Sequence, residues 1–116
     1  MAKLSKELIG ATSIPIILSV LERQPSYGYE IIQAVKEVSE GYITYGDGTI
    51  YPVLHKMEKQ ELIESYWEVA ENGRKRKYYK LCEKGKSQLA SEQENWQIIH
   101  QIIAKLWRLD HPLTFS

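Results

Sequence analysis

The sequence has a single cysteine, Cys82, among its 116 residues. A disulfide within the chain is therefore excluded, and the composition is typical of a reducing compartment. The chain also has no net charge, because 15 basic residues are balanced by 15 acidic ones. The overall composition gives no reason to expect binding to nucleic acid or to a membrane, so any electrostatic function must come from local clusters of charge.

The chain also lacks a long hydrophobic run. The apolar stretch near its start falls within residues 14–21, far short of the roughly 20 apolar residues that a membrane-spanning helix needs. No cleavage site of small residues, as in a signal peptide, follows this stretch. We therefore expect a soluble, cytoplasmic protein that makes no membrane contact.

Signatures of catalysis and metal binding are missing too. The three histidines, His55, His100 and His111, and the single cysteine do not have the spacing of metal ligands. The sequence contains no phosphate-binding loop and no nucleophile motif. It therefore predicts neither an enzyme nor a bound metal or other cofactor.

The first half of the chain does contain helix signals. Residues 14–21 are nearly all apolar, which predicts a buried helix that begins at Ser13 with Pro15 in its first turn. Ser26 is the expected N-cap of a second helix that ends near Gly41. The apolar face of this second helix consists either of Tyr29, Ile32 and Val35 or of Ile31 and Val38.

A third, short helix is predicted around residues 49–60. Ile50, Leu54 and Met57 recur at helical spacing and form its apolar face. Thr49 as the N-cap would keep Pro52 in the first turn, whereas Asp47 would interact better with the helix dipole but places Pro52 deeper. The pattern leaves both caps open.

In the second half of the chain, the spacing of the apolar residues first changes from that of a helix to that of β-strands. Two β-prone runs flank Asn72-Gly73 within residues 64–82, which is the strongest hairpin signal in the chain. From Lys86 to about Leu109 the sequence has no glycine or proline, which predicts a long helix. Apolar residues keep a heptad spacing along it and form more apolar surface than one small domain can cover. The expected dimer interface consists of Leu89, Trp96, Ile99, Ile103 and Leu106.

Three helices followed by a hairpin are the arrangement of a winged helix-turn-helix, in which the third helix reads a DNA groove. We therefore expect a mainly α chain with a small β-hairpin, in the α+β class. Residues 1–83 would form the DNA-binding domain, and residues 84–116 a C-terminal dimerisation helix.

Positive charge is concentrated in the hairpin, or wing. Between Glu71 and Lys80 the chain has five cations and one acid, a net charge of +4. Such a loop can neutralise phosphates and reach a minor groove, although a charge run at a hairpin tip can also be merely solvated. The third helix and the start of the second add hydroxyls and cations that can reach phosphates or bases, unless they form only a polar surface. The candidate DNA-binding residues are Tyr27, Gly28, Thr49, Tyr51, His55, Lys56, Lys59, Arg74, Lys75, Arg76 and Lys77.

Three stretches of the sequence resemble the PadR family of bacterial transcriptional regulators. They are "SYGYEI" at residues 26–31, "GTIYPVLHKMEKQELIES" at 48–65 and "GRKRKYYKLCEKG" at 73–85. The single long C-terminal helix resembles the short-tailed subgroup of this family. Two positions depart from the family pattern: Cys82 stands where threonine is usual, and Gly48 where many members have proline.

The resemblance implies a dimeric repressor that binds double-stranded DNA at a palindromic operator. Some short-tailed members bind a planar aromatic effector between the subunits, against a tryptophan of the last helix, and Trp96 matches that position. By sequence alone, an aromatic residue at a heptad position, as Trp96 is, usually belongs to a dimer core, so the effector role rests on the resemblance. Two other functions remain open: a winged-helix module that binds another protein, and a dimer that sequesters drugs without binding a specific operator.

Overall fold

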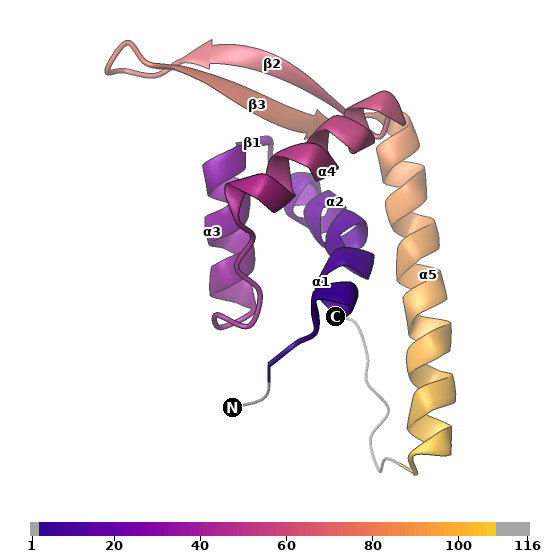
Figure 1. Ribbon diagram of the computed structural model, residues 1–116. Coiled ribbons are helices and arrows are strands. Elements are labelled where there is room, and N and C mark those ends of the chain that lie inside the picture. The colour runs from indigo at the N-terminus through magenta and orange to yellow at the C-terminus, as the bar shows by residue number, and fades with distance from the viewer. Residues whose placement is uncertain (1–2, 109–116) are drawn as a thin grey trace.

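The computed structural model describes residues 3–108, which form five helices and a small sheet (Figure 1). The helices are α1 (Lys6–Ala11), α2 (Ser13–Arg23), α3 (Gly28–Val38), α4 (Asp47–Lys59) and α5 (Glu83–Leu106). The strands are β1 (Ser26–Tyr27), β2 (Ile63–Val69) and β3 (Lys75–Leu81). The α+β fold with three helices, a wing and a long last helix is as predicted, while α1 and β1 are additions.

Helices α2, α3 and α4 enclose the core, which is built from the apolar faces that their sequences predict. Ile17, Ile31, Ile50 and Leu54 have no exposed surface at all. Burying each such side chain stabilises the fold by about 1.5–3 kcal/mol. On α3 the large apolar residues that are buried are Ile31, Ile32 and Val35, so the apolar face combines parts of the two predicted alternatives.

The starts of α3 and α4 differ from the predictions. Ser26 belongs to β1, and its hydroxyl donates to the Gln24 carbonyl at 3.2 Å, so Tyr27 is the N-cap of α3 instead. Helix α4 is capped by Gly46, which contributes no side chain. Both Asp47 and Thr49 therefore lie within the helix.

This earlier start places Pro52 in the second turn of α4. A proline at that depth has no N–H to donate to the carbonyl four residues before it, which belongs to Gly48. The helix continues to Lys59 nonetheless, with Ile50, Leu54 and Met57 buried on its inner side. The packing of this side against α2 and α3 compensates for the missing hydrogen bond.

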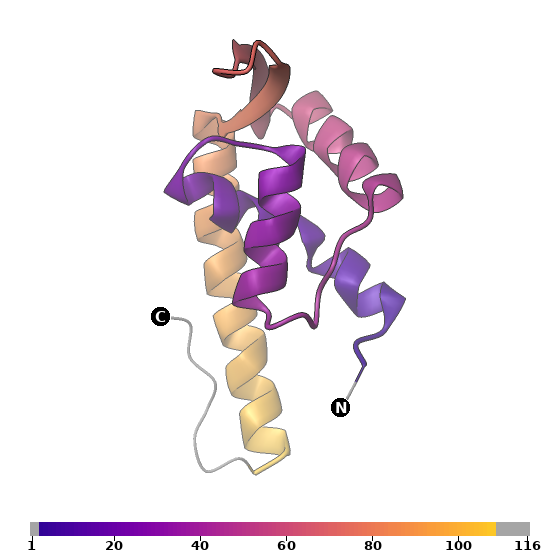
Figure 2. The same cartoon turned by 90° about the vertical axis from the view of Figure 1, so that its left-hand side faces the viewer.

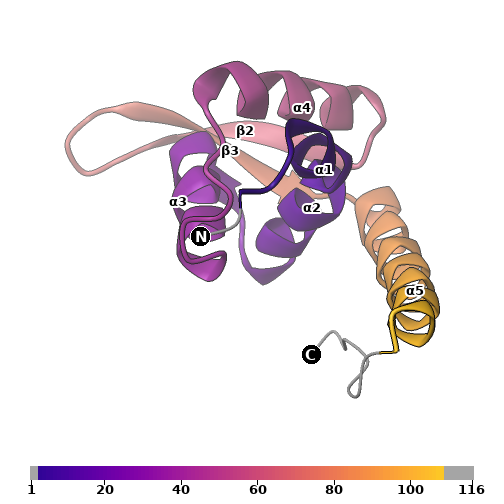
Figure 3. The same cartoon turned by 60° about the horizontal axis from the view of Figure 1, so that its bottom comes forward.

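The sheet has the strand order β1-β3-β2, and both pairs are antiparallel. Ser65 of β2 and Ser26 of β1 lie on either side of Tyr79 in β3. The turn between β2 and β3 is closed by a hydrogen bond from the Gly73 N–H to the Ala70 carbonyl at 2.9 Å. Gly73 has φ +80°, a conformation that glycine adopts without strain. The tip of this wing projects beyond α3 and α4 (Figures 1 and 3).

Helix α5 starts immediately after the wing. Its N-cap is Cys82, three residues earlier than the predicted start at Lys86 would require, and the Cys82 N–H donates to the Leu62 carbonyl at 3.0 Å. Gly85 lies in the first turn because a Cβ there would come within 2.1 Å of the same carbonyl oxygen. The helix then extends past the other helices (Figure 2). The predicted end near Leu109 lies outside the described residues, as does His111.

Within residues 3–108, none of the helices combines the length and apolar character needed to cross a membrane.

Candidate nucleic-acid interface

The start of α3, the outer side of α4 and the wing meet at a cleft of about 360 Å³. Its walls come from elements that are far apart in the sequence. Seven of the eleven candidate DNA-binding residues line this cleft. The lining residues are Tyr27, Gly28, Tyr29, Tyr51, His55, Trp67, Lys75, Arg76, Lys77 and Tyr79.

At the start of α3, backbone geometry brings two of these residues together. Tyr27 has extended backbone angles, and its N–H donates to the Glu30 carboxylate at 3.2 Å, which helps to cap the helix. Gly28 is buried under the side chain of Tyr51, and a Cβ on Gly28 would lie 2.7 Å from the Tyr51 hydroxyl. Tyr29 belongs to one of the two predicted apolar faces of this helix but is 61% exposed, so it lies at the rim of the cleft.

Helix α4 divides its polar residues between the cleft and open solvent. Tyr51 and His55 are one helical turn apart and both line the cleft. Thr49, Lys56 and Lys59 are exposed on the same helix but lie outside the cleft. The helix therefore presents the Tyr51 hydroxyl and the His55 imidazole to the cleft and its lysines to the solvent outside the cleft.

Arg76 links the wing to the start of α3. Its guanidinium donates to the Tyr27 hydroxyl at 2.8 Å and lies 4.6 Å from the centre of the Tyr27 ring. The Tyr27 ring in turn contacts Tyr78 edge-on, with 5.4 Å between the ring centres. Because the hydroxyl of Tyr27 accepts this hydrogen bond, its own proton is left to donate elsewhere.

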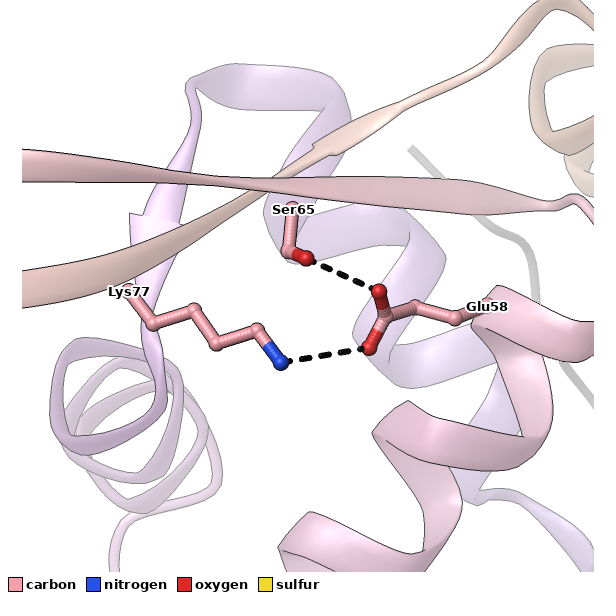
Figure 4. A network of polar contacts seen from close by, with 3 residues as sticks. All are labelled: Glu58, Ser65 and Lys77. Atoms are coloured by element: carbon pink, nitrogen blue, oxygen red, sulfur yellow. Dashed lines mark hydrogen bonds and ion pairs between the residues drawn. The ribbon is translucent and has the colours of Figure 1, made fainter.

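Lys77 links the wing to α4 through Glu58 (Figure 4). The two atoms of this ion pair, Lys77 Nζ and Glu58 Oε1, are 3.7 Å apart. The other oxygen of Glu58 accepts a hydrogen bond from the Ser65 hydroxyl at 2.8 Å. Glu58 thus connects α4 to both strands of the wing. We call Glu58, Ser65 and Lys77 the wing brace.

Tyr79 lies beneath the wing brace. Its ring is 1% exposed, and the Lys77 ammonium lies 5.6 Å from the ring centre. Burial and the nearby Glu58 carboxylate raise the pKa of Tyr79 to about 12. Its hydroxyl therefore stays protonated at any physiological pH.

The cations nearest the tip are the ones left free for a ligand. Arg74 and Lys75 are exposed, and neither forms an ion pair with any residue in the described part of the chain. The backbone N–H of Arg74 donates to the Asn72 side chain at 3.0 Å, which orders the turn. Of the four predicted wing cations, two are thus held by other elements and two are available.

The predicted dimer interface on α5 is only partly exposed. Leu89 is 2% exposed and belongs to the core of the single chain. Ile99 is 46% and Leu106 74% exposed, while Ile103 is half-buried. Three further apolar residues widen the exposed face: Ile98, Ile102 and Trp107.

Trp96 lies half-buried on α5 between two polar neighbours. Its indole N–H donates to the Glu92 carboxylate at 3.0 Å, and the His100 ring centre is 6.4 Å from its own. This leaves a flat aromatic surface with its polar edge already hydrogen-bonded. Within residues 3–108, no group of three or more histidines, cysteines or acids could hold a metal ion.

Helices α2 to α4, the wing and a cleft lined with cations and aromatic side chains define a winged helix-turn-helix protein. The family model described as "Transcriptional regulator PadR-like family" matches residues 17–91. The chain belongs to this family, and it is therefore a DNA-binding transcriptional regulator.

Three individual proteins are similar to this chain. The uncharacterized protein X of Lysinibacillus sphaericus is 34% identical over 88 residues, which covers 76% of this chain and 81% of that protein. The transcriptional regulator YqjI of Escherichia coli is 33% identical over 88 residues, but the match covers only 41% of its length. The crystal structure of a PadR family transcription regulator from Clostridium difficile is 34% identical, with a TM-score of 0.72 over 83% of this chain and 98% of that one.

Proposed function

We propose that this protein is a dimeric repressor that binds a palindromic DNA operator. The observation that carries the proposal is the cleft, because residues from α3, α4 and the wing converge there, among them the free cation Lys75, which Arg74 precedes in the chain. Residues 1–83 would contact DNA, and residues 84–116 would join two subunits. Each subunit would then read one half of the operator.

In this proposal, α4 enters the major groove. Tyr51 and His55 face the bases or the nearest phosphates, while Lys56 and Lys59 add charge along the groove walls. Tyr27 donates its free hydroxyl proton to a backbone phosphate, and the Arg76 guanidinium beside it favours the approach of an anion. Arg74 and Lys75 neutralise phosphates next to the wing.

The apolar face of α5 supports the dimer. Four of its residues, Ile98, Ile99, Ile102 and Leu106, and its C-cap Trp107 are large, apolar and about half or more exposed. A continuous face of this kind is typical of a surface that another protein covers. A second copy of α5 would cover it with the same face, since two-fold interfaces are self-complementary.

The experiment that tests the repressor proposal is selection of bound duplexes from a random DNA pool. We expect the enriched sequence to be palindromic, with half-sites separated by about one helical turn. A promoter carrying that sequence should then lose transcription when the protein is added. Enrichment without symmetry would contradict the dimeric mode of binding, and activation of the promoter would contradict repression.

Trp96 supports an effector role for the dimer interface. In a two-fold dimer the same indole occurs twice, so a planar aromatic compound could stack between the two rings, each contributing about 0.5–1.5 kcal/mol beyond burial. Titration of planar aromatic dyes should give weaker binding to the Trp96→Ala protein than to the parent. Equal affinities would exclude Trp96 from the effector site.

A further inference from the structure

The outer half of the wing has an apolar patch that the helices leave uncovered. Trp67 is 66% exposed and Val69 is 61% exposed. They are two residues apart on β2, so they lie on the same face of the sheet. Their partners across the sheet are Lys77 and Lys75. We call Trp67, Val69, Lys75 and Lys77 the wing patch.

The two faces of the wing differ in charge. On the face opposite the wing patch, Glu64 pairs with Lys80 at 3.2 Å, and Glu68 lies across from Arg76. That face is therefore balanced by its own carboxylates. The wing-patch face has two lysines and no carboxylate from either strand, and only Glu58 of α4 reaches Lys77.

The wing patch is continuous with the candidate DNA interface. Trp67, Lys75 and Lys77 line the same cleft as Tyr51 and His55 of α4. An occupant of this surface must offer an anionic group to Lys75 and must also present apolar surface to an indole. A DNA strand meets both requirements, because phosphates alternate with the hydrocarbon faces of the deoxyribose rings.

We propose that Trp67, with Val69 beside it, docks against the deoxyribose wall of the DNA minor groove, while Lys75 neutralises the adjacent phosphate. This inference rests on the proposed function and adds a non-ionic contact to a wing that otherwise binds through charge. The indole N–H can donate to a phosphate oxygen at the edge of the same contact. Lys77 stays with Glu58 and keeps the patch at a fixed angle to α4.

The test compares the salt dependence of DNA binding in two kinds of variant. A mixed-sequence DNA duplex at low salt is titrated with the parent, Trp67→Ala and Lys75→Ala. We expect Trp67→Ala to weaken binding about tenfold, the size expected when a large apolar side chain is no longer buried. The slope of log affinity against log salt should stay unchanged for Trp67→Ala and fall by about 0.9 for Lys75→Ala, which neutralises one phosphate fewer.

A second measurement reports on Trp67 directly. Binding of the duplex should shift and shield tryptophan emission in the parent, and this change should be absent in Trp67→Phe, which should keep most of the affinity. Val38→Ala is the control for loss of exposed apolar surface and should leave DNA binding unchanged, since Val38 is 69% exposed on α3 at the end away from the cleft. Thermal denaturation of each variant checks that the fold is intact.

The outcomes separate the two proposals. If the parent binds the duplex and Trp67→Ala binds equally well, the wing-patch contact is wrong while the repressor proposal stands. If Trp67→Ala loses affinity together with salt slope, Trp67 acts only by arranging the cations, and the apolar contact is again wrong. If the parent itself does not bind, both proposals fail.

Discussion

The Tyr45 hydroxyl, in the loop between α3 and α4, is a buried polar group. It has no hydrogen-bond partner within residues 3–108, although Tyr45 is only 3% exposed. We expect Tyr45→Phe to raise the free energy of unfolding by about 1 kcal/mol, because it removes a polar group that burial has stripped of water. Urea denaturation measures this, and a loss of stability would show that the hydroxyl is satisfied.

The ionisation of two buried tyrosines limits the stability of the folded protein at alkaline pH. Burial raises the pKa values of Tyr45 and Tyr79 to about 12, compared with the ordinary value of 10.0. Above pH 10 the unfolded chain loses these protons while the folded chain retains them, so stability that is complete below pH 10 is lost between pH 10 and about 12. We expect Tyr45→Phe to make this loss less steep in denaturation series across that range.

Gly28 offers a way to displace Tyr51 without unfolding the chain. A Cβ at residue 28 would lie 2.7 Å from the Tyr51 hydroxyl, which is the far end of a side chain that can rotate away. We expect Gly28→Ala to weaken DNA binding about tenfold while lowering stability by less than about 1 kcal/mol. Mobility-shift titrations and thermal denaturation measure the two effects.

Gly85→Ala is the contrasting variant. There the added Cβ would meet the backbone carbonyl of Leu62, which cannot move away without breaking the corner between the wing and α5. Its stability should therefore fall by several kcal/mol, as is typical of severe overpacking. If Gly28→Ala were as destabilising as Gly85→Ala, Tyr51 would have a structural role in place of a DNA contact.

At the scale of the elements, the wing separates fixed cations from free ones. Arg76 and Lys77 are held by Tyr27 and Glu58, whereas Arg74 and Lys75 are exposed. We expect Arg74→Ala with Lys75→Ala to weaken binding to all DNA sequences alike and to lower the salt slope by about 0.9 for each phosphate that is no longer neutralised. Lys6→Ala with Lys36→Ala removes the same charge from α1 and the far end of α3, and should leave the slope unchanged.

Periodicity was enough to predict the main elements of this fold. The apolar faces of α2 and α4, the Asn72-Gly73 hairpin and the long last helix all follow from local patterns. Local patterns do not reveal β1, because Ser26–Tyr27 is a strand only through pairing with Tyr78 and Tyr79, about fifty residues later. The same pairing is why Ser26, a good N-cap by composition, is not the cap of α3.

The candidate site was predictable in composition but not in its contacts. Charge density pointed to all four wing cations, yet which ones are free depends on Glu58 and Tyr27, which the sequence places far from the wing. Trp67 gave a usable signal that was missed: strand alternation places it across from Lys77, on the face that turns toward α4. No periodic pattern predicts the wing brace, since it depends on the angle between α4 and the sheet.

At the scale of the whole molecule, the proposed dimer depends on α5. We expect Ile99→Asp with Leu106→Asp to yield a folded monomer, because both side chains are substantially exposed in the single chain and a carboxylate would be buried only in the dimer. Sedimentation measures the assembly, and Val38→Asp is the control on another exposed apolar residue. A double variant that remains dimeric would place the interface elsewhere.

The corner between the wing and α5 has a mechanical consequence. Leu81 ends β3, Glu83 begins α5, and Cys82 between them is tied to the Leu62 carbonyl. This hydrogen bond therefore helps to fix the direction of α5 relative to the wing. One residue inserted into the first turn of α5 would swing the rest of the helix by about 100° around its axis, turning its apolar face away from the direction it now has. An insertion at the hairpin tip, by contrast, would leave this corner intact.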